Sequence, residues 1–293
     1  MARFKKIFLS VLKYLLYIIL SLLLALVIRL FLCNFYRVPS GSMEPGIIIG
    51  DFILAGKLSY GGRIFTSLKF DKYSDPQMIR VPGFRSVRRN DLVVFNFTYR
   101  DYHAPWDTIR MNFNMCFVKR CIGLPGDSLS SVDGFYRVTG LTDTLGYIPG
   151  QRKMARQYSI STDPHIAHIS AFDSSFHWNA INFGPFYIPA AGRTIELNPQ
   201  NFKLYHKQIV YETRATIRIE DSLVYINDTL TRYYKFRHNW YFMAGDNMIK
   251  SEDSRFFGLV PHEYIIGKAS MVLSSKDMRT GKRRWNRMFK RIK

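Results

Sequence analysis

The sequence predicts a mainly β protein that is preceded by one N-terminal transmembrane helix, and three observations support this prediction. Residues 14–32 form a nearly unbroken apolar run. Beyond this run, Val, Ile, Tyr, Phe and Thr gather in short bursts that Gly, Pro, Asn and Asp interrupt, which is typical of β structure. No second apolar run is long enough to cross a bilayer. With 293 residues, the chain has room for one large domain or two modest ones.

The apolar run has about the length that a bilayer-spanning helix needs. Lys13 precedes it, and Arg29 lies near its far end, where a long side chain can snorkel to the interface. A cleaved signal peptide is the alternative, because the basic N-terminus fits both. The run is long for a signal peptide, however, and no small-residue cleavage site follows it. We therefore expect residues 1–35 to be a cytoplasmic N-terminus and an uncleaved anchor, with the rest of the chain outside the cytoplasm.

The exported part is expected to be a β-barrel or β-sheet core with an accessory insertion. Core segments are 36–130 and 241–275, and the less regular stretch 131–240 is expected to be an inserted β-subdomain. Asn227-Asp228 lies between alternating residues and predicts a hairpin turn. The predicted β segments are 47–54, 92–99, 208–219, 222–230 and 264–273.

The last part of the chain, residues 276–293, is a basic C-terminal tail. It holds nine of the 42 Lys and Arg residues and one acid, in a chain whose net charge is +20. Trp285, Met288 and Phe289 are interleaved with these charges. Beside a membrane anchor, this pattern favours contact with anionic lipid headgroups. Nucleic acid is a weaker alternative, because no nucleic-acid-binding motif accompanies the charge.

Cysteines and histidines indicate neither a disulfide framework nor a metal site. If 116–121 is one strand, Cys116 and Cys121 point to opposite faces, and Cys33 lies at the end of the apolar run. His165 and His168 can share a helical face, but no third ligand is placed by spacing. We therefore expect no metal and no other cofactor.

A serine-rich turn follows the anchor. In Val38-Pro39-Ser40-Gly41-Ser42-Met43-Glu44-Pro45, two serines flank a glycine, and prolines stiffen the backbone on both sides. Such a turn can present a serine with little bulk around it. The serine is a candidate nucleophile only if a base can reach it. An ordinary Ser/Gly/Pro loop at the membrane exit is the alternative.

Lys119 is the candidate base for this serine. On a strand, Phe117, Lys119 and Cys121 share one face. Apolar neighbours such as Val118 and Ile122 would disfavour the charged ammonium and lower the pKa of the lysine. The alternative is a surface lysine with no catalytic role.

Four sequence blocks occur in order behind the anchor: 39–45, 50–54, 90–95 continuing at 119–127, and 245–258. Together they resemble those of the bacterial type I signal peptidases, or leader peptidases, a family of serine endopeptidases with a Ser/Lys dyad. The resemblance implies that Ser42 is the nucleophile and Lys119 the general base. It further implies that the Ser40 hydroxyl and the Ser42 N–H form the oxyanion hole, and that Ser251 orients the lysine. Structural roles are implied for Asp246, Asp253 and Arg255.

The resemblance also implies a preference for small residues at the first and third positions before the cut (Ala-x-Ala). Positions that match the shallow substrate pockets are Tyr36, Val38, Pro39, Met43, Ile47, Ile53, Val94, Phe117 and Val118. Phe117 and Cys116 depart from the family, since many members have tyrosine and an acidic residue there. Met248-Ile249-Lys250 likewise replaces a more charged stretch.

The sequence thus predicts a single-pass protease of the bacterial inner membrane, with its catalytic domain on the outer or periplasmic side. The expected partners are signal peptides of exported precursors, anionic lipid and the protein-export machinery, and no nucleic acid. A self-cleaving regulator of the repressor type shares the dyad, but the membrane anchor disfavours it. A cationic envelope-binding protein without catalysis is the alternative from another class, and the intact Ser42, Lys119, Ser40 and Ser251 argue against it.

Overall fold

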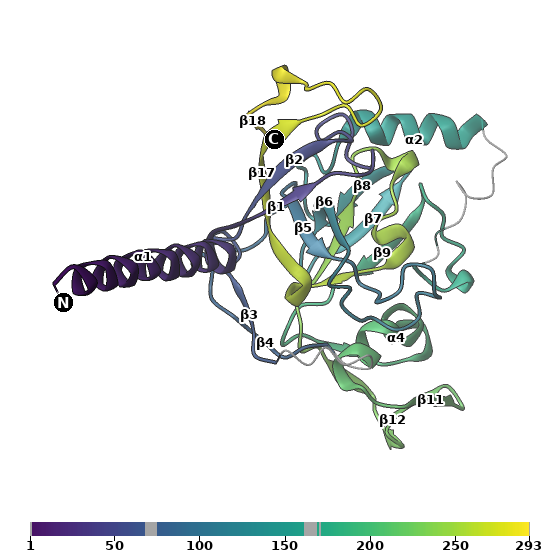
Figure 1. Ribbon diagram of the computed structural model, residues 1–293. Helices are drawn as coiled ribbons and strands as arrows, with labels where there is room; N and C mark the ends of the chain where they lie inside the picture. The colour runs from purple at the N-terminus through teal and green to yellow at the C-terminus, as the bar shows by residue number, and fades with distance from the viewer. Residues whose placement is uncertain (1, 68–74, 161–168, 170, 293) are drawn as a thin grey trace.

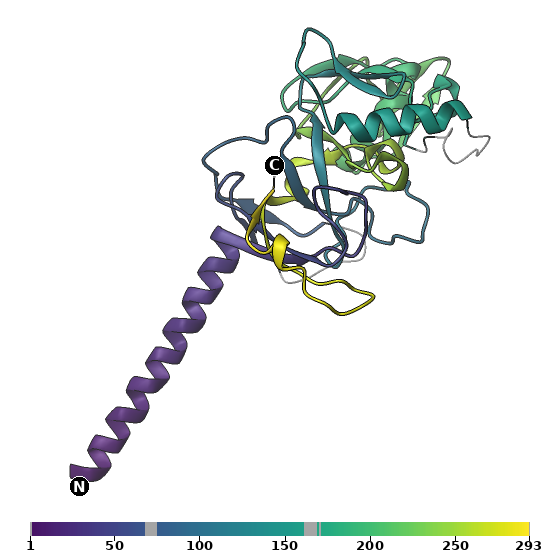
Figure 2. The same ribbon diagram turned by 90° about the horizontal axis from the view of Figure 1, so that it is seen from above.

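The computed structural model describes residues 2–67, 75–160, 169 and 171–292. It begins with the apolar helix α1 (Ala2–Val27), which a π-helical turn (Ile28–Leu32) continues. Figures 1 and 2 show α1 projecting away from the rest of the molecule. Within the described residues, one helical span, Phe4–Leu32, is long and apolar enough to cross a membrane. The predicted N-terminal helix is therefore confirmed.

The helix leads into the main sheet without a linker. Strand β1 (Cys33–Arg37) begins directly after Leu32, and the backbone N–H of Lys57 donates to the Leu32 carbonyl oxygen at 2.8 Å. The end of the helix is therefore hydrogen-bonded to the chain just beyond the second strand, β2 (Asp51–Gly56).

The main sheet is antiparallel and curled, with the order β1-β2-β17-β5-β6-β15-β16 and with β18 added beside β17. Figure 1 labels its strands β1, β2, β5, β6, β17 and β18. The mainly β fold predicted from the sequence is confirmed. Beyond β1, the strands are β2 (Asp51–Gly56), β5 (Leu92–Asn96), β6 (Cys116–Gly123), β15 (Trp240–Ala244), β16 (Val260–Pro261), β17 (Ile265–Ser275) and β18 (Lys290–Arg291).

Both faces of this sheet are buried at β5 and β15, which explains why these two strands read as apolar runs. Strands β5 and β15 are buried at every position. Alternate residues of β5 enter different clusters: Phe95 packs with the larger core, whereas Val94 packs with the smaller one. Successive side chains of a strand point to opposite faces, so the alternation places one cluster on each side.

Residues 131–240 contain helices as well as strands. Among the described residues of this region, the α-helices are α2 (Ile148–Ile160) and α4 (Pro199–Thr213). The strands are β7 (Ser128–Val132), β8 (Phe135–Val138), β9 (Phe183–Tyr187), β10 (Thr194–Glu196), β11 (Ile217–Glu220), β12 (Leu223–Ile226), β13 (Thr229–Leu230) and β14 (Tyr233–Lys235). Outside this region, β3 (Arg63–Phe65) pairs with β4 (Met78–Arg80).

The prediction of a β segment over 208–219 is wrong for its first half, because 208–213 belong to α4, whereas 217–219 belong to strand β11. Asn198 caps this helix by accepting a hydrogen bond from the Asn201 N–H at 2.8 Å, and Pro199 occupies its first turn. Tyr205 and Ile209 lie four residues apart and are both buried. Similarly, the segment predicted at 47–54 becomes extended at Asp51. The hairpin turn at Asn227-Asp228 is confirmed: both residues have positive φ angles, 48° and 60°, and they join β12 to β13.

The C-terminal segment is folded onto the core. Strand β18 pairs with β17. Arg287 is buried and forms an ion pair with Asp51, with an Nε–Oδ1 distance of 3.0 Å. Trp285 and Phe289 remain exposed.

Candidate active site

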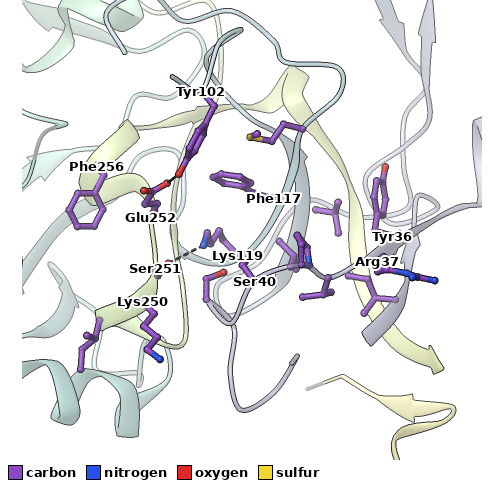
Figure 3. A pocket seen from close by; sticks show the side chains of 18 of the residues that line it. Tyr36, Arg37, Ser40, Tyr102, Phe117, Lys119, Lys250, Ser251, Glu252 and Phe256 are labelled. Atoms are coloured by element: carbon purple, nitrogen blue, oxygen red, sulfur yellow. Dashed lines mark hydrogen bonds between the residues drawn. The ribbon is translucent and has the colours of Figure 1, made fainter. Parts of the chain in front are cut away.

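A cleft of about 860 Å³ lies beside β1 and β6 and contains the predicted catalytic side chains (Figure 3). Its walls come from the end of β1 and the turn after it, from β6, and from the segments 102–115 and 249–256. The cleft residues are Tyr36, Arg37, Val38, Pro39, Ser40, Ser42, Ile53, Val94, Tyr102, Trp106, Met115, Phe117, Val118, Lys119, Ile249, Lys250, Ser251, Glu252 and Phe256.

The turn that carries Ser42 is hydrogen-bonded to the Gly-Asp-Asn motif at 245–247. The Asn247 N–H donates to the Ser42 carbonyl oxygen at 3.0 Å, and its side-chain amide donates to the Gly41 carbonyl oxygen at 3.1 Å. A Cβ atom on Gly245 would lie 2.1 Å from Ser251 Oγ and 2.7 Å from the Ser42 carbonyl oxygen. Only glycine therefore lets these two serine-bearing segments approach so closely.

Lys119 is buried on β6 and faces Ser251. Its Nζ donates to Ser251 Oγ at 3.0 Å and lies 5.4 Å from the centre of the Phe117 ring. Burial lowers the pKa of Lys119 to about 8, although the nearby Asp253 carboxylate favours the charged form. A substantial fraction of neutral amine is therefore present near neutral pH, as a general base requires.

Two ion pairs brace the segments around the cleft. Arg255 and Asp253 are fully buried, with an Nε–Oδ1 distance of 2.8 Å. Burial alone would raise the pKa of Asp253, but the guanidinium outweighs it and holds that pKa below its usual value. Arg120 makes a two-pronged contact with Asp246, with both N–O distances at 2.7 Å. Asp246 therefore ties the Gly-Asp-Asn turn to the strand of the lysine.

Most of the predicted site residues lie together. Ser40, Ser42, Lys119 and Ser251 all line the cleft. In the described part of the chain, no hydrogen bond joins Ser42 to Lys119, whose amine donates to Ser251 instead. Of the predicted pocket residues, Met43 and Ile47 do not line the cleft but lie buried in the smaller core.

Sequence reasoning did not assign several residues of the site. Arg120 and Asn247 belong to motifs that it noted, so their positions were available but their partners were not. Tyr102, Trp106 and Met115 carry no motif, and only the folded chain places them at the cleft. No group of three or more metal-ligating side chains occurs in the described residues. His165 and His168 lie outside those residues.

Comparison with known proteins identifies the family of the chain. A family model described as "Signal peptidase, peptidase S26" matches residues 11–168 and 191–274. The chain belongs to the signal peptidase family. It is therefore a hydrolase, a peptidase that cleaves signal peptides, and its apolar α1 indicates membrane association.

Curated relatives cover most of this signal peptidase chain. Signal peptidase I of Buchnera aphidicola subsp. Schizaphis graminum is 28% identical over 263 residues, covering 85% of this chain and 70% of the relative. That of Aquifex aeolicus is 25% identical over 268 residues, covering 90% and 84% respectively. A solved signal peptidase I from Enterococcus faecalis is 17% identical, covers 64% of this chain and 98% of its own, and superimposes with a TM-score of 0.29.

Proposed function

We propose that this chain is a single-pass membrane endopeptidase that removes signal peptides from exported precursors, with Ser42 as nucleophile and Lys119 as general base. The observation that supports this most directly is Lys119 itself. It is a buried lysine with a pKa lowered to about 8, in the same cleft as a serine on a tight turn. No surface role explains a lysine held in this way.

The proposed reaction proceeds by acyl transfer. The neutral Lys119 amine removes the Ser42 hydroxyl proton while Oγ attacks the scissile carbonyl carbon. The developing oxyanion accepts hydrogen bonds from the Ser42 N–H and the Ser40 hydroxyl. The Lys119 ammonium then gives its proton to the leaving amine, and an ester joins Ser42 to the signal peptide. A water molecule, deprotonated by Lys119, hydrolyses this ester and regenerates both side chains.

The proposed substrate preference is for Ala-x-Ala sites. The cleft that holds Ser42 is lined in part by apolar residues, among them Val38, Ile53 and Val118. Apolar walls favour apolar side chains such as alanine and offer no partner for charged ones.

We place the catalytic domain on the outer or periplasmic face of the bacterial inner membrane. Ser42 follows Leu32 by only ten residues, so the site lies near the bilayer surface. We further propose that 36–130 and 241–275 form the catalytic core and that 131–240 is an accessory insertion. The exposed basic and aromatic residues of 276–293 are suited to anionic lipid, and the export machinery would deliver the precursors.

The test is cleavage of a purified precursor with an Ala-x-Ala site by detergent-solubilised protein. We expect the wild type to cut at that site, and Ser42→Ala and Lys119→Ala to be inactive. Ser159→Ala and Lys235→Ala are matched controls at exposed positions and should cut normally. An inert wild type, or cutting by the two active-site variants, would favour a non-catalytic envelope protein instead.

A further inference from the structure

A second hydrogen bond lies beside the Lys119–Ser251 pair. The hydroxyl of Tyr102 donates to the carboxylate of Glu252, the residue directly after Ser251. Tyr102 belongs to the segment between β5 and β6, so this bond joins two separate walls of the cleft. Figure 3 shows both hydrogen bonds at the same end of the cleft, away from Tyr36 and Arg37.

Tyr102 is held in place by the aromatic cluster that also walls the lysine. Its ring packs against Phe97 and Trp106, with centroid distances of 5.7 and 5.8 Å. The indole N–H of Trp106 donates to the Tyr102 carbonyl oxygen at 3.2 Å. Phe97 in turn packs against Phe117 at 4.9 Å, and Phe117 lies beside the Lys119 amine. The hydroxyl of Tyr102 is therefore presented from a fixed support.

Ser251 is fastened on both of its sides. On the buried side, Asp253 accepts a hydrogen bond from the Gly245 N–H at 3.0 Å and pairs with Arg255. On the solvent side, Glu252 is exposed and is held by Tyr102. Ser251, whose hydroxyl accepts from Lys119, therefore lies beside one residue with buried contacts, Asp253, and one with a solvent-exposed contact, Glu252.

We propose that the Tyr102–Glu252 hydrogen bond is a clasp across the mouth of the cleft, which positions Ser251 against Lys119 and limits the access of water to the lysine. This inference rests on the proposed Ser42–Lys119 chemistry. Tyr102 and Glu252 act through Lys119 and are positioning residues.

The clasp has two separable components, its hydrogen bond and its negative charge. The charged groups that act on Lys119 are Asp253, Arg255, Glu252 and Asp246. Lys250 also lines the cleft. Among these, the carboxylate of Glu252 favours the charged lysine, whereas the closed clasp favours the neutral lysine by keeping it dry.

Two conservative variants therefore have opposite expected effects. Glu252→Gln keeps an acceptor for the Tyr102 hydroxyl but removes the charge, so the pKa of Lys119 falls. Tyr102→Phe removes the donor but leaves the carboxylate, and it opens the lysine to water, so that pKa rises. A general loss of stability would not shift the pKa of Lys119 in opposite directions in the two variants.

The measurement is the pH dependence of kcat/KM for precursor cleavage by the full-length protein. We expect the acidic limb to move down by about half a pH unit in Glu252→Gln and up by a similar amount in Tyr102→Phe. Glu220→Gln and Tyr233→Phe are matched controls at exposed positions and should leave the limb in place. Thermal unfolding of all four variants verifies that they are folded.

The proposed clasp would be overturned if the acidic limb of the pH profile stayed in place in both variants. It would also be overturned if the limb moved in the same direction in both. If Ser42→Ala or Lys119→Ala still cuts, the proposed dyad fails first. If both of those residues are required and the two clasp variants keep the wild-type profile, the clasp alone fails.

Discussion

Arg287 and Asp51 form a buried ion pair that joins the C-terminal segment to the start of β2. The Arg287 guanidinium also donates to the Gly46 carbonyl oxygen at 2.9 Å, within the stretch that follows Ser42. Arg287 belongs to the tail that the sequence predicts to contact lipid headgroups, yet its side chain supports the stretch that follows Ser42.

Removing this support should destabilise the fold. Arg287→Ala leaves the Asp51 carboxylate buried without an opposite charge, with the Ile48 N–H as a remaining hydrogen-bond donor, which costs about 3 kcal/mol in the free energy of unfolding. Urea denaturation measures the loss. Arg283→Ala, at an exposed position in the same segment, is the control and should change stability by less than about 0.5 kcal/mol. Equal losses in the two variants would contradict a specific role for the ion pair.

Gly245→Ala should abolish most of the activity while leaving the protein folded. The new methyl group would push apart Ser251 and the Ser42 segment, and a displacement of about 1 Å at a catalytic group costs on the order of 100-fold in rate. The measurement is kcat/KM on a precursor. Gly56→Ala is a matched control, because the nearest atom to its Cβ would be 3.9 Å away. Normal activity in Gly245→Ala would show that the close approach is not needed.

Activity should depend on pH through Lys119. With the neutral amine as the proposed base, kcat/KM should rise about tenfold for each pH unit below a pKa of about 8 and level off above it. The pH–rate profile tests this expectation directly. A plateau that extends down to pH 6 would indicate that another group activates the serine.

The buried charge of Lys119 should also lower the free energy of unfolding. Its pKa is lower in the folded chain than in the unfolded one, so the unfolded state binds more protons between about pH 8 and 10.5 and stability rises across that range. Lys119→Met should therefore stabilise the protein at pH 7, by on the order of 2–3 kcal/mol, with the gain shrinking as the pH rises toward 10. Chemical denaturation at several pH values tests both sign and window. Lys235→Met, at an exposed position of β14, is the control and should change stability by less than about 0.5 kcal/mol at neutral pH.

The anchor, the β core and the hairpin at Asn227-Asp228 could be predicted because each has a local signal. The apolar run, the short segments rich in β-forming residues and the turn dipeptide can each be recognised from neighbouring residues in the sequence. The helix α4 was missed because Ile209, Val210 and Tyr211 favour strands, and that preference outweighed the start signal at Asn198-Pro199.

The site was predictable to the extent that it consists of motifs. Ser42, Lys119 and Ser251 stand in recognisable blocks, and the structure places them in one cleft. Tyr102 could not be found in this way, since its role depends on how the segment between β5 and β6 folds against Glu252. Arg287 was equally hidden, because its partner Asp51 is 236 residues away along the chain.

The direct junction between α1 and β1 has a consequence for how substrates are chosen. The Leu32 carbonyl is hydrogen-bonded to the Lys57 N–H, and no linker separates the helix from the sheet. The height of the cleft relative to the lipid surface is then set by the protein itself. The bond to be cut must reach that height, so the length of a precursor's apolar segment would help to decide which bond is presented, in addition to the side chains around it.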